Sequence, residues 1–189
     1  STPLGAFYQR VEAQASEVCF VQPNPDGSIV EFTWQEVDRQ VRTMAAYLRS
    51  LNYDPGSNIA LMSNNCAHWI MADLAIWMAG HTSVPLYPVL TAKSIRQILE
   101  HSGSKAMFVG KLTGYDEMKP GIPEDVHLMT LPLAPDAARK EYVDWDEIMD
   151  QFEPISDSPT RALDDLATII YTSGTTGMPK AVMWRNEDV

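Results

Sequence analysis

The sequence predicts an α/β fold in which helices flank a parallel β-sheet. Two strand-like apolar runs, 59–62 and 82–86, lie on either side of a helix-like run from about 67 to 78. This strand–helix–strand spacing is typical of a parallel βαβ unit with a right-handed crossover. A further helical segment then leads to a third strand-like run over 106–109, so the alternation of strands and helices continues.

Ahead of this unit, the chain predicts a helix, a hairpin and a second helix. Residues 2–15 have a helical pattern, and Asp26-Gly27 lies between β-prone runs at 18–21 and 29–32, which is a hairpin signal. Thr33 begins the second helix, and Glu36 three residues later completes a capping box. The apolar residues of this helix recur at helical spacing: Val37, Val41, Met44, Leu48 and Leu51.

Within the βαβ unit, the helix over 67–78 is apolar nearly all round, so we expect it to be buried. Pro85 limits ladder bonding, so we expect the strand over 82–86 to be irregular there. Thr91 caps the next helix, which carries Ile95, Ile98 and Leu99.

Residues 113–165 differ in composition from the rest of the chain. They hold six of the 13 prolines and 14 of the 25 acidic residues. We predict a strand at 126–129, a short amphipathic helix over 143–152, and solvated connections elsewhere. Two more β-prone runs, 167–171 and 181–184, follow this region.

Length and composition predict a protein of about one domain, and they argue against nucleic-acid binding and against a membrane-spanning segment. With 189 residues and 45% hydrophobic content, the chain suffices for about one domain. The net charge of −11 argues against nucleic-acid binding, which needs clustered Lys and Arg. The longest apolar stretch, 69–79, is too short to span a bilayer. Cys19 and Cys66 are the two cysteines; we predict free thiols and a cytoplasmic location.

The segment between the last two β-prone runs carries chemistry suited to a polyphosphate. Residues 171–180 read Tyr-Thr-Ser-Gly-Thr-Thr-Gly-Met-Pro-Lys. Glycine lets successive N–H groups converge on an anion, hydroxyls add donors, and lysine adds a mobile charge. The candidate binding residues are Thr172, Ser173, Gly174, Thr175, Thr176, Gly177 and Lys180.

Two other interpretations of this segment are rejected. In a Walker A loop, Pro179 would be glycine and Ala181 would be Ser or Thr, and the loop would open a helix rather than a strand. A hairpin without a ligand usually needs a turn of only about two to five residues. The segment is therefore predicted to bind phosphate.

Other polar groups are better explained as structural. Asp73, beside an apolar helix, is expected to be buried and partnered. Asp144, Asp146, Glu147 and Asp150 lack the glycine and the spacing of an EF-hand loop, so we place them on a solvated helix face. The histidines show no metal-ligand spacing, and no nucleophile arrangement is visible. We therefore predict no metal site and no catalytic residue in this chain.

The segment 171–180 resembles the phosphate-binding signature of the adenylate-forming (AMP-binding) superfamily, and its lead-in, 163–170, matches the usual approach to that signature. Upstream, segments 69–75, 83–87 and 95–102, followed by 107–109, resemble the long-chain acyl-CoA synthetase branch. The resemblance runs over most of the chain. The loop is highly specific for the superfamily, whereas the upstream segments favour the branch moderately.

This resemblance implies an N-terminal piece of a larger enzyme. Residues 1–165 would be the N-terminal α/β part of its large domain, and 166–184 the strand–loop–strand that carries the ATP signature. The C-terminal remainder and the lid domain would lie beyond Val189, with the ribose contacts, the Mg²⁺ carboxylate and the catalytic lysine. We therefore expect this chain alone to be inactive.

The implied activity is ATP-dependent ligation of a carboxylic acid, a long-chain fatty acid by resemblance, to coenzyme A. ATP, the acid and CoA are the expected small-molecule partners, and Mg²⁺ is the expected cofactor. Two alternatives remain: adenylation with another acceptor (an acyl-carrier protein, or luciferase-type chemistry), and, for this chain alone, a non-catalytic nucleotide-binding or scaffold domain. Peripheral membrane contact, chain length of the acid and oligomeric state are left open.

Overall fold

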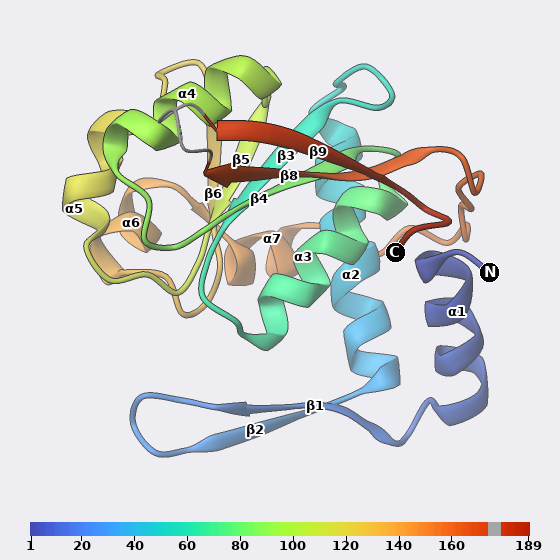
Figure 1. The fold of residues 1–189 in the computed structure, drawn as a ribbon. Helices are drawn as coiled ribbons and strands as arrows, with labels where there is room; N and C mark the ends of the chain where they lie inside the picture. Colours follow the sequence, from blue (N-terminus) through green and yellow to red (C-terminus); the bar gives the residue numbers. More distant parts are fainter. Residues whose placement is uncertain (174–178) are drawn as a thin grey trace.

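A computed structural model describes residues 1–173 and 179–189 (Figure 1). The strands of this part are β1 (Val18–Pro23), β2 (Ile29–Thr33), β3 (Asn58–Met62), β4 (Thr82–Leu86), β5 (Ala106–Val109), β6 (His127–Thr130), β7 (Val143–Asp144), β8 (Leu166–Ser173) and β9 (Pro179–Arg185). The helices are α1 (Pro3–Gln14), α2 (Trp34–Ser50), α3 (Ala67–Met78), α4 (Ala92–Ser102), α5 (Tyr115–Met118), the 3₁₀ helix η1 (Lys119–Gly121), α6 (Asp136–Glu141) and α7 (Trp145–Gln151).

Seven of these strands form one sheet, in the order β7-β6-β5-β3-β4-β8-β9. β3 pairs in parallel with β4 and with β5, which confirms the predicted βαβ unit. The register between β3 and β4 is continuous through Pro85, which lies opposite Leu61. The predicted irregularity at Pro85 was therefore wrong for the β3 side of the strand. β1 and β2 form a separate antiparallel hairpin, as predicted.

β4 is added on one side of β3, and the next strand, β5, is added on the other side. This change in the order of the strands places helices on both faces of the sheet. β4 lies on one side of β3 and β5 lies on the other, so right-handed crossovers put α3 and α4 on opposite faces. One core lies between the sheet and α1, α2, α3 and α7, with Leu4, Met71 and Trp145 fully buried. The second core contains residues of α4, α5 and α6. Figure 1 shows these layers.

Both predicted helix caps form through the expected hydroxyls. The Thr33 hydroxyl accepts a hydrogen bond from the Glu36 amide at 3.2 Å, and the Thr91 hydroxyl accepts one from the Ser94 amide at 3.2 Å. The Glu36 carboxylate, however, accepts from the side chains of Arg39 and Gln40, at 2.7 and 3.1 Å. The Glu36 carboxylate therefore bonds to side chains along α2, whereas the predicted capping box needs it to accept from the Thr33 amide.

Residues 113–165 are more ordered than their composition predicts. α5 and α6 lie where we expected solvated connections. The strand predicted at 126–129 is β6, parallel to β5. The helix predicted over 143–152 begins at Trp145, because Val143–Asp144 form β7. Asp144 is only 9% exposed and accepts a hydrogen bond from the Asp146 amide at 3.2 Å, so its placement on a solvated helix face was wrong.

α3 is buried over most of its surface, as predicted, although Ile70 is 40% exposed. Asp73 on this helix is buried through its Oδ1 atom, and that atom has no hydrogen-bond partner among the described residues. Burial raises the pKa of Asp73 to about 7, an effect that a hydrogen bond with Ser83 partly opposes.

Both cysteines are free thiols. Among the described helices, none has the length and apolarity needed to cross a membrane.

Candidate functional site

The predicted phosphate-binding segment joins the last two strands of the sheet. β8 runs parallel to β4, with Thr168 opposite Ser83. Its carboxyl end therefore emerges at the same edge as the carboxyl ends of β3, β4 and β5. This edge is where open α/β sheets bind ligands. β9 then returns antiparallel to β8, with Lys180 opposite Thr172.

The amino end of β8 is held by hydrogen bonds to its backbone carbonyls. The Trp77 indole donates to the Ala167 carbonyl at 2.7 Å. The Leu166 carbonyl accepts from the Thr82 hydroxyl at 3.2 Å and from the Arg161 guanidinium at 3.1 Å. Because these donors come from α3, β4 and the segment before β8, the start of the strand is fixed from several directions.

The carboxyl end of β8 is joined to α4 through a side chain. Tyr171 is 5% exposed and belongs to the core beneath α4. Its hydroxyl lies 2.7 Å from Nδ1 of His101, in the last turn of α4. The two rings also meet edge to face, with centroids 5.6 Å apart. Burial raises the pKa of Tyr171 above its usual value, so the phenol is neutral at physiological pH.

The structure places three of the seven predicted binding residues. Thr172 and Lys180 are exposed and directly paired, with the Thr172 hydroxyl 3.4 Å from the Lys180 carbonyl. Ser173 ends β8. Gly174, Thr175, Thr176 and Gly177 lie outside the described residues. Lys180 belongs to strand β9 rather than to a helix, which agrees with the rejection of a Walker A loop.

No local pattern in the sequence marks the residues that support this hairpin. Trp77, Arg161 and His101 contact β8 from positions about 90, 5 and 70 residues away along the chain. Nothing in the local pattern around His101 marks a contact with Tyr171. Such contacts are set by the packing of α4 on the sheet, which local motifs do not report.

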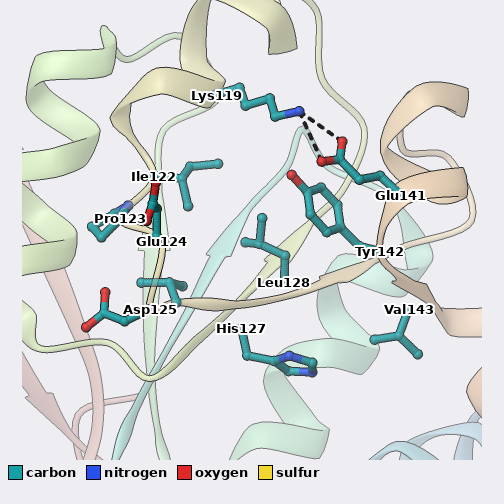
Figure 2. Close-up of a pocket in the computed structure, with 11 residues that line it drawn as sticks. Lys119, Ile122, Pro123, Glu124, Asp125, His127, Leu128, Glu141, Tyr142 and Val143 are labelled. Atoms are coloured by element: carbon teal, nitrogen blue, oxygen red, sulfur yellow. Dashed lines mark hydrogen bonds and ion pairs between the residues drawn. The ribbon is translucent and has the colours of Figure 1, made fainter.

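A hollow of about 770 Å³ lies beside β6, toward the opposite end of the strand order from β8 (Figure 2). It is lined by His127 and Leu128 of β6, which β5, β3 and β4 separate from β8. Its one lysine, Lys119, is paired with Glu141 at 2.9 Å. The remaining charged groups in its wall, Glu124 and Asp125, would repel phosphate. The charge of this hollow therefore does not suit the ligand that the sequence predicts.

Within residues 1–173 and 179–189, no three His, Cys, Asp or Glu side chains are grouped so that they could hold a metal ion. The chemistry available to the described part of the hairpin is therefore hydrogen bonding by Thr172 and the positive charge of Lys180. Both groups suit an anionic ligand.

Comparisons with known proteins place this geometry in context. Residues 7–189 match the family model described as AMP-binding enzyme. One relative is a 3-[(3aS,4S,7aS)-7a-methyl-1,5-dioxo-octahydro-1H-inden-4-yl]propanoyl:CoA ligase of Rhodococcus jostii (strain RHA1). It is 33% identical over 172 residues, which cover 82% of this chain and 32% of that protein. Long chain acyl-CoA synthetase 4 of Arabidopsis thaliana is 30% identical over 175 residues, covering 86% of this chain and 26% of the relative. The chain thus spans about a third or less of the length of these relatives.

Solved structures share the fold. An acetoacetyl-CoA synthetase from Streptomyces lividans matches 98% of this chain and 30% of its own, with a TM-score of 0.82 and 22% identity. The anthranilate CoA ligase AuaEII in complex with anthranoyl-AMP matches 99% of this chain and 35% of its own, with a TM-score of 0.81 and 18% identity. These likenesses confirm the predicted α/β class with a mostly parallel sheet.

Proposed function

Because the chain belongs to the AMP-binding enzyme family, we propose that it supplies the phosphate-binding part of an acid–CoA ligase. The observation that carries this proposal is the position of the β8–β9 hairpin. Thr172 and Lys180 lie at the carboxyl edge of a parallel sheet, in a family whose matched members include CoA ligases. Residues 1–165 would form the α/β part of the large domain and 166–184 its phosphate-binding strand–loop–strand.

The proposed reaction has two steps. A carboxylate oxygen of the acid bonds to the α-phosphorus of ATP, and the bond from that phosphorus to pyrophosphate breaks, which leaves an acyl-adenylate. The CoA thiol then loses its proton and bonds to the acyl carbon, and AMP leaves. The first step needs stabilisation of phosphate charge more than a protein nucleophile.

The role proposed for this chain is to hold the β- and γ-phosphates during the first step. The Lys180 ammonium would offset the charge of the departing pyrophosphate, and Thr172 would donate a hydrogen bond beside it. We include Ser173, Gly174, Thr175, Thr176 and Gly177 in this site from their residue types. Mg²⁺ is implied by the family, and within residues 1–173 and 179–189 no three His, Cys, Asp or Glu side chains are grouped for a metal ion. The contacts that we propose for this chain are therefore those to phosphate.

We propose a long-chain fatty acid as the acid substrate. The relatives named long chain acyl-CoA synthetase or long-chain-fatty-acid–CoA ligase support this choice. A relative named for a bicyclic propanoyl-CoA product is somewhat more similar in sequence, so acids of that class belong in the same test. A cytoplasmic location is part of the proposal and is supported by the two free thiols.

The full-length protein that carries this chain offers the direct test. We expect acid-dependent exchange of labelled pyrophosphate into ATP, and formation of a CoA thioester with a long-chain acid. Exchange without a CoA thioester would favour an acyl-carrier protein or a luciferase-type reaction as the second step. No exchange with any long-chain or bicyclic acid would contradict adenylation itself.

The chain of 189 residues should be assayed beside it. A few hydrogen bonds net only about 1 kcal/mol each, and association costs at least ~4 kcal/mol. We therefore expect millimolar or weaker ATP binding by calorimetry, and no thioester synthesis. Micromolar ATP binding without turnover would favour the nucleotide-binding or scaffold alternative for this chain.

A further inference from the structure

We infer that His101 is a positioning residue that holds the loop end of β8 in place through Tyr171. The two ends of this strand are anchored differently. At its start, carbonyls at Leu166 and Ala167 accept hydrogen bonds from neighbouring elements, and Thr168 pairs with Ser83 of β4. Further along, from Ile169 to Ser173, the strand is paired with β9, which belongs to the same hairpin.

The loop end of the hairpin packs in the second core, against residues of β3 and β4 as well as of α4. Ile169 and Tyr171 are buried in the core that α4 covers. Packing alone leaves a buried side chain some freedom to slide, whereas a hydrogen bond fixes distance and direction. The Tyr171 hydroxyl and Nδ1 of His101, 2.7 Å apart, supply such a restraint. α4 ends directly after this turn, at Gly103, which has a positive φ of 60°.

This restraint acts next to the proposed phosphate contacts. Tyr171 precedes Thr172 and lies opposite Ala181, which follows Lys180. A shift of Tyr171 would thus move both described phosphate-binding residues together. Misplacement of a binding group by about 1 Å can cost a large factor in rate. This part of the inference rests on the proposed function, whereas the mechanical role of His101 does not.

The restraint does not need a particular charge on the imidazole. A neutral His101 can accept the Tyr171 hydroxyl hydrogen at Nδ1 or donate from it, and a protonated imidazole donates from Nδ1 to the phenol oxygen. The partner of His101 Nδ1 in this bond is the hydroxyl of Tyr171, which is buried and neutral. Removing His101 should therefore change ATP affinity without moving the pH profile.

Variants can separate this bond from general stability. Tyr171→Phe deletes the hydroxyl and keeps the ring, and His101→Leu deletes the ring nitrogens. His101→Asn keeps a polar atom at the same number of bonds from Cβ as Nδ1, whereas His101→Gln moves it one bond further out. Tyr47→Phe is the matched control. It deletes another Tyr–His hydrogen bond, from Tyr47 to Nε2 of His127 at 2.7 Å, at the β6 side of the sheet, which lies away from β8.

The first measurement needs no enzymatic activity. Amide hydrogen exchange is followed at residues 169–173 and 180–183 in the 189-residue chain. Loss of one neutral hydrogen bond should speed exchange there about five-fold in Tyr171→Phe and His101→Leu. His101→Asn should restore protection and Tyr47→Phe should leave it unchanged. Unchanged exchange in both Tyr171→Phe and His101→Leu, or equal effects of Tyr47→Phe, would overturn the inference.

The second measurement uses pyrophosphate exchange by the full-length protein. We expect the KM for ATP to rise about five-fold in Tyr171→Phe and His101→Leu, with the KM for the acid and the pH profile unchanged, and with rescue by His101→Asn but not by His101→Gln. A loss confined to the acid KM, or equal rescue by both amides, would contradict positioning. If the wild-type protein shows no exchange activity, the proposed function fails, and the hydrogen-exchange result still decides the role of His101.

Discussion

Thr172 and Lys180 lie directly opposite each other in the β8–β9 ladder, with the Thr172 hydroxyl 3.4 Å from the Lys180 carbonyl. The pairing places one hydroxyl and one ammonium at the loop end of the same hairpin. Both side chains are exposed, so the Lys180 ammonium can reach a ligand, and the Thr172 hydroxyl can do so by exchanging its long bond to the Lys180 carbonyl for one to the ligand. This relationship allows the phosphate assignment to be tested at a residue that the structure describes.

Lys180→Ala in the full-length protein should slow acyl-adenylate formation. A charge-assisted contact is worth about 1.5–3 kcal/mol, which corresponds to a loss of roughly ten- to a hundred-fold. Acyl transfer from preformed acyl-adenylate to CoA should change much less. The two half-reactions can be measured separately by pyrophosphate exchange and by single-turnover thioester formation.

Lys105→Ala is the control for this change. Lys105 is exposed just before β5, at the amino edge of the sheet, so the substitution removes the same charge far from the carboxyl edge. It should leave both half-reactions unchanged. Equal slowing of both half-reactions by Lys180→Ala, in a folded protein, would show that Lys180 does not act on the leaving pyrophosphate.

Asp73→Asn should stabilise the chain above pH 7. The pKa of Asp73 in the native state is about 7, chiefly because of burial, whereas in the unfolded chain it is about 3.9. Between these values the unfolded state releases a proton that the native state retains, so stability falls as pH rises from about 4 to about 7. The substitution should gain on the order of 2–4 kcal/mol at pH 8.

Urea unfolding at pH 5 and pH 8 measures this effect. The gain at pH 5 should be only about a third of that at pH 8, since most of the loss in the wild type occurs between pH 5 and the native pKa. Asp150→Asn, at an exposed position on α7, should change stability little at either pH. A gain of equal size at both pH values would mean that Asp73 does not carry the pH dependence.

Asp144→Ala should destabilise the chain far more than Asp146→Ala. Arg139 donates to both oxygens of Asp144 at 2.8 Å each, and the Thr130 hydroxyl also donates to it at 2.8 Å. Burial by itself would raise the pKa of Asp144, but the hydrogen bonds from Arg139 and Thr130 and the charge of Arg139 outweigh it and lower the pKa. Removing this carboxylate should cost about 1.5–3 kcal/mol, because Arg139 stays partly exposed and keeps its contact with Asp146.

Asp146 serves as the comparison, because it contacts the same Arg139 at 3.0 Å with a side chain that is 64% exposed. Its loss should cost less than about 1 kcal/mol. Thermal and urea unfolding of the two variants at pH 7 measure the difference. Similar costs would show that burial of the Arg139–Asp144 pair contributes little.

Gly121→Ala should weaken the packing of η1 against α4. An added Cβ at Gly121 would overlap the Ala92 carbonyl oxygen and lie 2.7 Å from the Ala92 Cα. These are backbone atoms, so the clash cannot be relieved by a side-chain rotation, and we expect a loss of about 1–3 kcal/mol. Gly5→Ala meets the side chain of Thr2 at 3.2 Å instead and should cost less in the same unfolding assay.

Local signals in the sequence predicted the boundaries of most elements up to β5. The hydroxyls of Thr2, Thr33 and Thr91 accept hydrogen bonds from amides three residues later, so each cap is visible within a few residues of sequence. The acidic pattern at 144–150 predicted a solvated face that included Asp144, and for Asp144 this prediction was wrong. Its burial depends on Thr130 and Arg139, and no local pattern shows that these side chains converge.

The sequence by itself determined the α/β class and the composition of the segment for which we propose phosphate binding, because helix periods, caps and turn residues act over a few positions. Only the tertiary structure decided that β8 lies beside β4, that Tyr171 meets His101 across 70 positions, and that the Oδ1 atom of Asp73 is buried without a partner among the described residues. These outcomes follow from how apolar faces pack together, since burial depends on which distant surfaces meet. In the described part of the candidate site, the chemical groups therefore come from one short segment, whereas the residues that hold that segment in place come from distant parts of the chain.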